Sequence, residues 1–460
     1  MIFFLMGILL QYISHPRYPD EIPDVGYGRG FLGYLKNNIG YFIYQRKWIL
    51  EGYQKYSKNG LPFLAPGGMF RPYDVVLPQS MLSWLFEQPE SVVDAITAHN
   101  VNMFGRFNFL DPAVAKHNFG PRAVHKSLSR NLAELLPAVD DEIQHAIKKK
   151  TANVSEAWET ISLWDLWLDI VGPAANIALT GPDACRDKEF LRAIFNFNHV
   201  IFRNIIFLRM FPAFLHPLLG RLATISNWLY WRKAYKILGP IIKLRIDQMQ
   251  RRAGGEGESN EWTPPNDLIT WLIRLIQEEH PTAELDPVMI SKHMLPVELA
   301  AVDTTVVTGT LWIQDLLKSP TAINDLVEEL SAHQPAAGKR WSKEALLSLS
   351  RVDSSIRESQ RLSNFHLTLI ERAVIPTGGV RLPELGWMIP QGAQLTVNLD
   401  GSHHDSDVYD NPESYDAFRF SRERSTHGDN GKYDRNKPDR LGMVTMNDRH
   451  FAFGHGKHQW

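Results

Sequence analysis

The stretch that decides the fold lies at the end of the chain and reads Arg449-His-Phe-Ala-Phe-Gly-His-Gly-Lys-His-Gln-Trp460. Two shorter motifs precede it, Asp416-Ala-Phe-Arg-Phe420 and, further upstream, Glu358-Ser-Gln-Arg361. A spacing of three puts Glu358 and Arg361 on one helix face, where a carboxylate and a guanidinium can pair. Such pairs are common on surfaces and contribute about 0–1 kcal/mol. The information therefore lies in the order of the three motifs.

In this order the motifs resemble the signature of the cytochrome P450 family, and the resemblance covers roughly residues 20–460. It implies a fungal, microsomal-type haem-thiolate monooxygenase, with Phe453 and Gly454 in the loop that holds the haem. It also implies that Glu358, Arg361 and Arg419 form a buried ion-pair network with a structural role. The partners implied are O2, NADPH-cytochrome P450 reductase and a hydrophobic small molecule that is hydroxylated.

Composition indicates a globular protein and excludes several other classes. The 460 residues are 44% hydrophobic and 22% charged, and the net charge of -2 lacks the basic excess that nucleic-acid binding requires. Apolar residues recur at intervals of three and four from about residue 85 to 320, which predicts helices. Short β-rich pieces after about residue 365 predict a small sheet. We expect a mainly α (α+β) fold, with residues 21–460 forming a P450 domain.

A candidate oxygen-activating segment reads Ala300-Ala-Val-Asp-Thr-Thr305. Ala300 and Ala301 are small enough to let a helix backbone lie close to a flat cofactor, and an acid beside an alcohol, Asp303 and Thr304, can relay protons. A helix that merely carries threonines bonded to its own backbone would have the same residues. Pro296, one turn earlier, predicts a kink or a late helix start.

Cationic side chains are expected at the haem propionates. The resemblance offers Arg372, in Ile370-Glu-Arg-Ala-Val374, and His458 in the terminal loop. On an earlier helix it offers His125 or Arg130, although the family's Trp or His followed four residues later by Arg is not met, because Arg130 lies five residues after His125. An ordinary solvated helix face would explain these last two equally well.

The position of the axial ligand departs from the family pattern. Family spacing puts the cysteine at 460, where this chain has Trp460, whose indole N–H offers no lone pair to iron. Cys185 is expected to be a structural cysteine, and His455 or His458 could ligate iron only as imidazole. The sequence thus predicts no metal ligand and doubtful haem binding. The chain resembles a P450 domain that is C-terminally incomplete, lacking the helix and strands after the haem loop. Either a working monooxygenase underlies it or it is an inactive truncated form or pseudoenzyme.

The N-terminal residues 1–20 begin with an apolar run that is shorter than the roughly 20 residues needed to span a bilayer. We interpret this segment as a short membrane anchor or, equally, as a frayed apolar terminus. The corresponding localisations are the cytoplasmic face of the endoplasmic reticulum membrane and the cytosol.

Residues 190–231 are unusually apolar and aromatic. In the family this region roofs the substrate pocket, which suggests a terpenoid, polyketide or other secondary metabolite as substrate. Helical core packing would explain the same residues.

Overall fold

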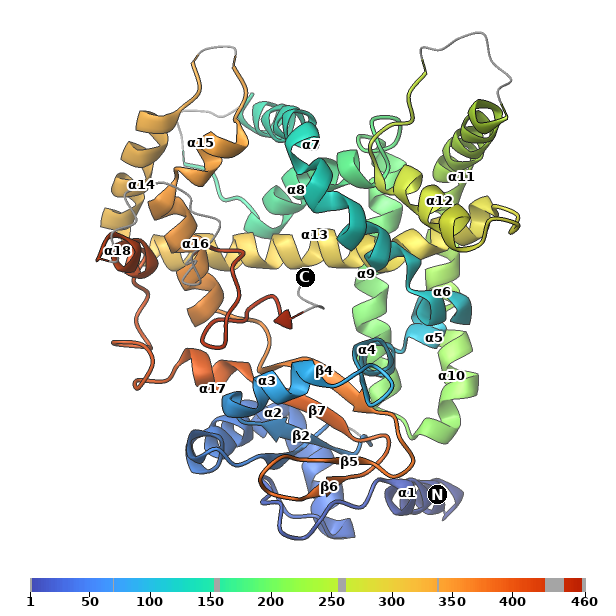
Figure 1. Cartoon of the computed structure of the whole chain (residues 1–460), viewed down its shortest axis with the longest axis vertical. Coiled ribbons are helices and arrows are strands. Elements are labelled where there is room, and N and C mark those ends of the chain that lie inside the picture. The colour runs from blue at the N-terminus through green and yellow to red at the C-terminus, as the bar shows by residue number, and fades with distance from the viewer. Residues whose placement is uncertain are drawn as a thin grey trace.

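The computed structural model describes residues 2–68, 70–152, 158–254, 262–336, 339–426 and 442–456. Helices make up most of the described chain (Figure 1). They are α1 Ile2–Ser14, α2 Phe31–Lys55, α3 Leu82–Glu87, α4 Ala95–Asn102, α5 Gly105–Asn108, α6 Pro112–His117, α7 Phe119–Thr151, α8 Leu163–Leu179, α9 Lys188–Arg209, α10 His216–Ala223, α11 Ile225–Ala253, α12 Leu268–Glu279, α13 Pro287–Leu317, α14 Pro320–His333, α15 Lys343–Leu347, α16 Ser350–Leu362, α17 Leu399–His403 and α18 Arg419–Thr426.

A small sheet lies at one end of the molecule, next to α2 and α3 (Figure 1). Its strands are β1 Phe63–Pro66, β2 Tyr73–Leu77, β3 Val93–Asp94, β4 Thr368–Val374 and β7 Gln394–Asn398, while β5 Val380–Arg381 and β6 Met388–Ile389 form a separate pair. Among the described residues the strand order is β1-β2-β7-β4-β3, with β2 and β7 parallel and the other neighbours antiparallel. The strands thus come from both ends of the chain.

Strand β4 contains a bulge in its pairing with β7. Leu369 pairs with Val397 and Arg372 pairs with Leu395, so two residues of β4 lie opposite the single residue between them on β7. Ile370 has a φ of 64°, which is unusual for a β-branched residue. Bulges of this kind redirect side chains next to functional sites, and here the two charged residues Glu371 and Arg372 follow directly.

Helix α13 crosses the middle of the molecule between the sheet and helices α7 and α8 (Figure 1). Asp286 caps its start by accepting a hydrogen bond from the backbone N–H of Val288, and Pro287 takes the first helical position. The helix continues through Pro296, so the predicted late start is wrong. Burial on several sides, including Met294, compensates for the backbone hydrogen bond that Pro296 cannot donate.

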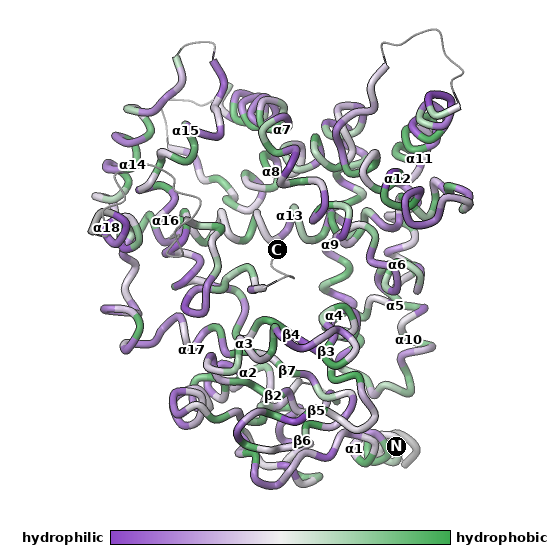
Figure 2. Tube along the Cα trace, viewed as in Figure 1, coloured by the Kyte–Doolittle hydropathy of each residue, from purple (hydrophilic) through white to green (hydrophobic). Residues whose placement is uncertain are grey.

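Two hydrophobic clusters position the site. The larger joins α9, α11, α12 and α13, and α9 is hydrophobic over much of its length (Figure 2). Phe190, Phe197 and Ile201 of α9 are buried in this cluster, so core packing explains part of the apolar segment 190–231. The second cluster lies on the sheet and includes Phe451, which is fully buried. The loop that decides the fold is thereby attached to the sheet.

The N-terminal helix α1 packs against the segment that leads into α10. A Cβ on Gly7 would lie 2.2 Å from Cε1 of Phe214, so a side chain at this position would displace the Phe214 ring. Gln11 accepts a hydrogen bond from the backbone N–H of Ala213 at 2.8 Å. Among the described helices, α13 alone is long and apolar enough to cross a membrane, and its packing in the core accounts for that composition.

Candidate functional site

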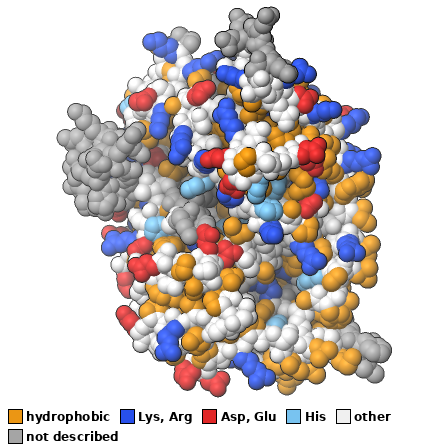
Figure 3. Space-filling model, turned by 45° about the vertical axis from the view of Figure 1, so that its right-hand side comes forward, with side chains coloured by type: hydrophobic (Ala, Val, Ile, Leu, Met, Phe, Trp, Pro, Cys, Tyr) orange, Lys and Arg blue, Asp and Glu red, His pale blue; other side chains and the backbone are white. Residues whose placement is uncertain are grey.

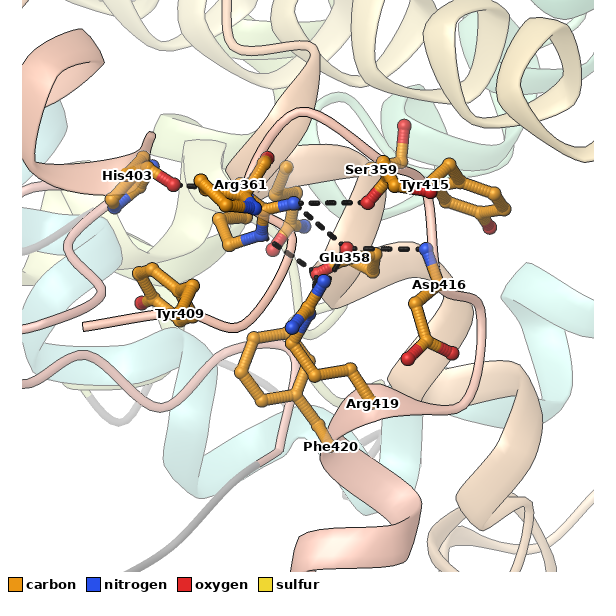
Figure 4. Close-up of polar contacts among 12 residues, drawn as sticks. Glu358, Ser359, Arg361, His403, Tyr409, Tyr415, Asp416, Arg419 and Phe420 are labelled. Atoms are coloured by element: carbon orange, nitrogen blue, oxygen red, sulfur yellow. Dashed lines mark hydrogen bonds and ion pairs between the residues drawn. The ribbon is translucent and has the colours of Figure 1, made fainter. Parts of the chain in front are cut away.

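The carboxylate of Glu358 sits between two arginines in the interior (Figure 4). Arg361 donates from Nε to Oε2 and from Nη2 to Oε1 of Glu358, both at 2.8 Å, and Arg419 donates from Nε to both oxygens at 3.1 Å. The Glu358 and Arg361 side chains have 0% exposure and that of Arg419 has 9%. The three side chains therefore meet in the manner that the family resemblance implies.

The same arginines hold the chain segment between α17 and α18. Arg361 Nη1 donates to the carbonyls of His403 at 2.6 Å and Pro412 at 2.7 Å, and Arg419 Nη1 donates to that of Asp410 at 2.6 Å. Both guanidinium groups thus bond to backbone carbonyls as well as to the Glu358 carboxylate. Removing one of the three side chains would leave the remaining buried charge uncompensated. The network thus fastens α16 to residues 403–419.

The described part of the terminal loop, residues 449–456, is held on both sides. Tyr409 donates its hydroxyl to the carbonyl of Arg449 at 2.9 Å, and the backbone N–H of Phe453 lies 3.4 Å from the sulfur of Met446. Gly454 has a φ of 79° and Gly456 a φ of 75°, conformations that favour glycine. The predicted positions His458 and Trp460 lie outside the described residues.

His455, the described alternative ligand, is engaged elsewhere. Its Nε2 lies 3.1 Å from Oδ1 of Asp448, and its ring meets Phe86 edge-on with centroids 5.0 Å apart. The single cysteine of the sequence, Cys185, is buried in the turn before α9, where burial raises the pKa of its thiol to about 11. A thiol of that kind is protonated and inert at neutral pH.

On α13 the predicted acid and alcohol have different partners. Asp303 accepts a hydrogen bond from Nδ2 of Asn198 on α9 at 2.6 Å, whereas Thr304 donates its hydroxyl to the carbonyl of Ala300 at 2.5 Å. Thr305 likewise donates to Ala301 at 2.8 Å. Burial raises the pKa of Asp303 to about 6. A carboxyl group with this pKa exchanges its proton near neutral pH.

A second buried acid, Glu298, lies on the same helix and was not among the predicted functional residues. It is 1% exposed, and burial raises the pKa of its carboxyl to about 8, with a further contribution from the charge of Asp303. Asn176 of α8 donates to its Oε2 at 3.4 Å, while Oε1 has no hydrogen-bond partner. The sequence contained one signal, an acid among apolar residues in the turn before Ala300.

The predicted propionate cations differ in burial. Arg372 is 6% exposed, and burial lowers the pKa of its guanidinium. Its Nη1 donates to the carbonyl of Glu371 at 2.9 Å, and among the described residues no carboxylate lies within ion-pair distance of it. His125 and Arg130 are exposed on α7. Because these two residues are five positions apart, their side chains point about 140° apart around the helix. Only one of them can therefore face a given cofactor.

These observations fit a haem on two of its sides. Arg372 is a buried cation, and the carboxylates that lie near it are those of Asp94, Glu90 and Glu371. It forms no ion pair among the described residues, and a propionate would suit it as a direct partner. Thr305 is exposed although it lies in the middle of the core helix α13, beside the small residues Ala300 and Ala301. This side of the helix thus borders a hollow in the interior rather than a packed neighbour. The axial position lies beyond the described residues.

Comparison with known proteins establishes the class. The model of the cytochrome P450 family matches residues 119–459, and the chain belongs to this family, whose members are haem-dependent monooxygenases. The prediction made from the three motifs is confirmed, as are the mainly helical fold with a small sheet and haem as the expected cofactor.

Individual relatives are fungal enzymes. The chain is 26% identical over 464 residues to the cytochrome P450 monooxygenase gloP of Glarea lozoyensis, covering 98% of this chain and 84% of that protein. It is 29% identical over 435 residues to olcJ of Penicillium canescens, a protein of the same description, covering 91% and 76%. The crystal structure of the cytochrome P450DA heme domain matches with a TM-score of 0.63 at 14% identity, covering 96% of this chain and 87% of that one. This structural match bears on the fold alone.

Proposed function

We propose that the chain oxidises a hydrophobic small molecule, of the terpenoid or polyketide kind, in fungal secondary metabolism. The observation that carries the proposal is Asp303, held by Asn198 next to the hollow that Thr305 borders. The fungal monooxygenases among the relatives support the same assignment. NADPH-cytochrome P450 reductase is the proposed electron donor.

The residues of this chain would hold the haem and transfer protons to its oxygen side. Haem, when bound, supplies oxygen binding and activation. Arg372 and, in the terminal loop, His458 would hold its propionates, with His125 or Arg130 as a further cation, and Phe453 and Gly454 would shape the loop beneath it. Ala300 and Ala301 would leave room for the flat group. Asp303 Oδ would pass protons inward, and Thr304 Oγ1 would hold the last proton of the relay.

Exchanging the acid tests this division. In Asp303→Asn the amide keeps the size and the hydrogen-bonding reach of the side chain but cannot exchange a proton at neutral pH. We expect turnover to fall about tenfold to a hundredfold while the substrate affinity of the purified enzyme stays unchanged. The measurement is product formation from isotopically labelled O2, with one labelled oxygen atom gained per product. Unchanged turnover would remove Asp303 from the mechanism.

A competing function is haem or lipid binding without oxygen activation, and the tryptophan at position 460 favours it. The carbon monoxide difference spectrum of the reduced protein separates the two. Thiolate ligation gives a strongly red-shifted Soret band and supports the monooxygenase. A band at the shorter wavelength typical of imidazole supports the binder.

We also propose that the protein docks on the endoplasmic reticulum membrane through α1 and α10. Leu10 and Ile13 of α1 are 59% and 55% exposed, and Leu218 and Leu222 of α10 are 63% and 56% exposed. The contact between Gly7 and Phe214 brings the two helices together. Hydrophobic side chains gather in the lower part of the space-filling view (Figure 3).

Paired substitutions test the membrane proposal. We expect Leu218→Ser with Leu222→Ser to weaken partitioning onto phospholipid vesicles at least about tenfold, measured by flotation. Leu132→Ser with Ile147→Ser, at similarly exposed apolar positions on α7, is the matched control and should bind vesicles like the unaltered protein. Equal loss in both pairs would contradict docking through α10.

A further inference from the structure

A group of charged and polar side chains lies where α4, β2, β4 and the end of α9 come together. We call it the channel cluster; its members are Arg71, Asp74, His99, Asn102, Arg209, His366 and Glu371. The electrostatic influence of Glu371 reaches Arg71, Asp74, His99, Arg209 and His366, so the groups lie near one another. None of them was a predicted functional residue. The inference below rests on the proposed function and specifies its substrate.

Most of the charges in the channel cluster already have partners. Arg71 donates from Nη2 to Oδ1 of Asp74 at 2.9 Å and to Oε1 of Gln394 at 2.8 Å. Glu371 accepts a hydrogen bond from Nδ2 of Asn102 at 2.5 Å. The Arg71–Asp74 pair is thus neutral as a unit, and the carboxylate of Glu371 is held by an amide from α4.

Arg209, the last residue of α9, is the exception. Its Nη2 donates to the backbone carbonyl of Asn102 at 3.3 Å, but its Nε is enclosed without any hydrogen-bond acceptor. Among the described residues no carboxylate lies within ion-pair distance of this guanidinium. Burial, with the positive charge of Arg71, lowers its pKa. Because Nε has no accessible surface, a ligand would meet the terminal nitrogens of the guanidinium, and the side chain as a whole is only partly buried.

The channel cluster borders an interior hollow. The side chains of His99 and His366 have accessible surface, yet burial lowers the pKa of both rings. A side chain that is accessible but poorly solvated faces an enclosed space rather than the outside of the molecule. The neighbouring Phe365 is 49% exposed and adds an apolar wall. Helix α4 and strand β4, which carry His99 and Glu371, lie side by side (Figure 1).

We propose that Arg209 binds the carboxylate of the substrate, so that the enzyme acts on a hydrophobic molecule that carries an acidic end. The terminal nitrogens Nη1 and Nη2 of Arg209 would donate to the two carboxylate oxygens, as arginine commonly does. Glu371 would repel an acid placed on its own side of Asn102, which directs the carboxylate to Arg209. The apolar part of the molecule would extend along the hollow toward α13.

The test compares an acid with its ester on the full-length purified protein. A dansyl-labelled long-chain fatty acid and its methyl ester are titrated, and their dissociation constants are obtained from the fluorescence. We expect the unaltered protein to prefer the acid. Arg209→Met should weaken acid binding at least about tenfold and leave ester binding within about twofold, and Arg209→Lys should restore part of the loss.

Arg203→Met is the matched control, because Arg203 lies on the same helix and contacts Ser226 instead. It should bind both probes like the unaltered protein. Equal affinity for acid and ester, tighter binding of an amine analogue, or parallel loss of both probes in Arg209→Met would overturn the inference. Probe fluorescence does not require turnover. Acid preference without oxygenation would therefore count against the proposed function alone, and oxygenation without acid preference against this inference alone.

Discussion

Two regions of the molecule bury ionisable groups in opposite ways. In the Glu358 network both arginines pair with the carboxylate and donate to backbone carbonyls, and the carboxylate accepts four hydrogen bonds from them. Around α13 and the end of α9, Glu298 and Arg209 each keep an enclosed atom without a partner. Paired buried charge fixes the position of a chain segment, whereas buried ionisable groups without partners are common where a proton or a ligand is handled.

The largest effect is expected from breaking the satisfied region. Glu358→Gln removes the charge that both arginines share, and we expect a loss of about 3–5 kcal/mol in the free energy of unfolding. Denaturant titration measures it. Glu328→Gln, at a position whose side chain is 79% exposed, is the control and should change stability by less than about 0.5 kcal/mol. Similar losses of unfolding free energy in both variants would mean that the buried Glu358 network stabilises the fold no more than an exposed carboxylate does.

The opposite result is expected on α13. The folded-state pKa of Glu298 is raised to about 8, so the fold binds a proton that the unfolded chain has released, and stability falls as pH rises from about 4.5 to 8. Glu298→Gln is neutral at every pH and avoids this loss. We expect it to stabilise the protein by about 3 kcal/mol at pH 7 and to leave stability unchanged near pH 4.

Thermal melts across this pH range measure the difference. Glu284→Gln, at an exposed position before α13, should leave the pH profile as it is. If the stability of Glu298→Gln varied with pH in parallel with that of the unaltered protein, Glu298 would be ionised in the fold. Its carboxylate would then resemble that of Glu358, which is stabilised by partners.

A smaller effect sharpens the comparison, because the Glu358 region has neighbours that are not satisfied. His403 and His450 stack with ring centroids 5.0 Å apart, and neither nitrogen of His450 has a hydrogen-bond partner. Burial lowers the pKa of His403 to about 3 and that of His450 well below its ordinary value. The neutral rings therefore contribute stability above pH 6.5 that is lost as pH falls.

We expect the unaltered protein to lose about 2 kcal/mol through His403 between pH 6.5 and pH 5, and His450 to add a further loss in the same direction. In His450→Phe, whose ring does not titrate, one such contribution should disappear. Unfolding titrations at the two pH values measure this. His145→Phe on the outer helix α7 serves as the control. If His450→Phe keeps the full acid sensitivity, the rings are not the groups that titrate.

How far the sequence could predict these regions depends on whether the partners are local. Glu358 and Arg361 are one helical turn apart, so their pairing follows from spacing, while Arg419 entered only through the family resemblance. Nothing in the sequence links Asp303 to Asn198 or Asn102 to Arg209, because those contacts form when α9 packs across α13 and α4. The late helix start expected at Pro296 was wrong for a related reason, since local propensity was outweighed by burial of the helix.

The bulge in β4 has a consequence for how this protein can change. It places Ile370 and Glu371 together opposite Thr396, after which regular pairing resumes with Arg372 opposite Leu395, and Val374 returns to the core on the sheet. A bulge residue lies outside the regular ladder, so its side chain is not dictated by a partner across the sheet. We therefore expect substitutions of Glu371 to change the charge of the channel cluster without shifting the pairing of any strand.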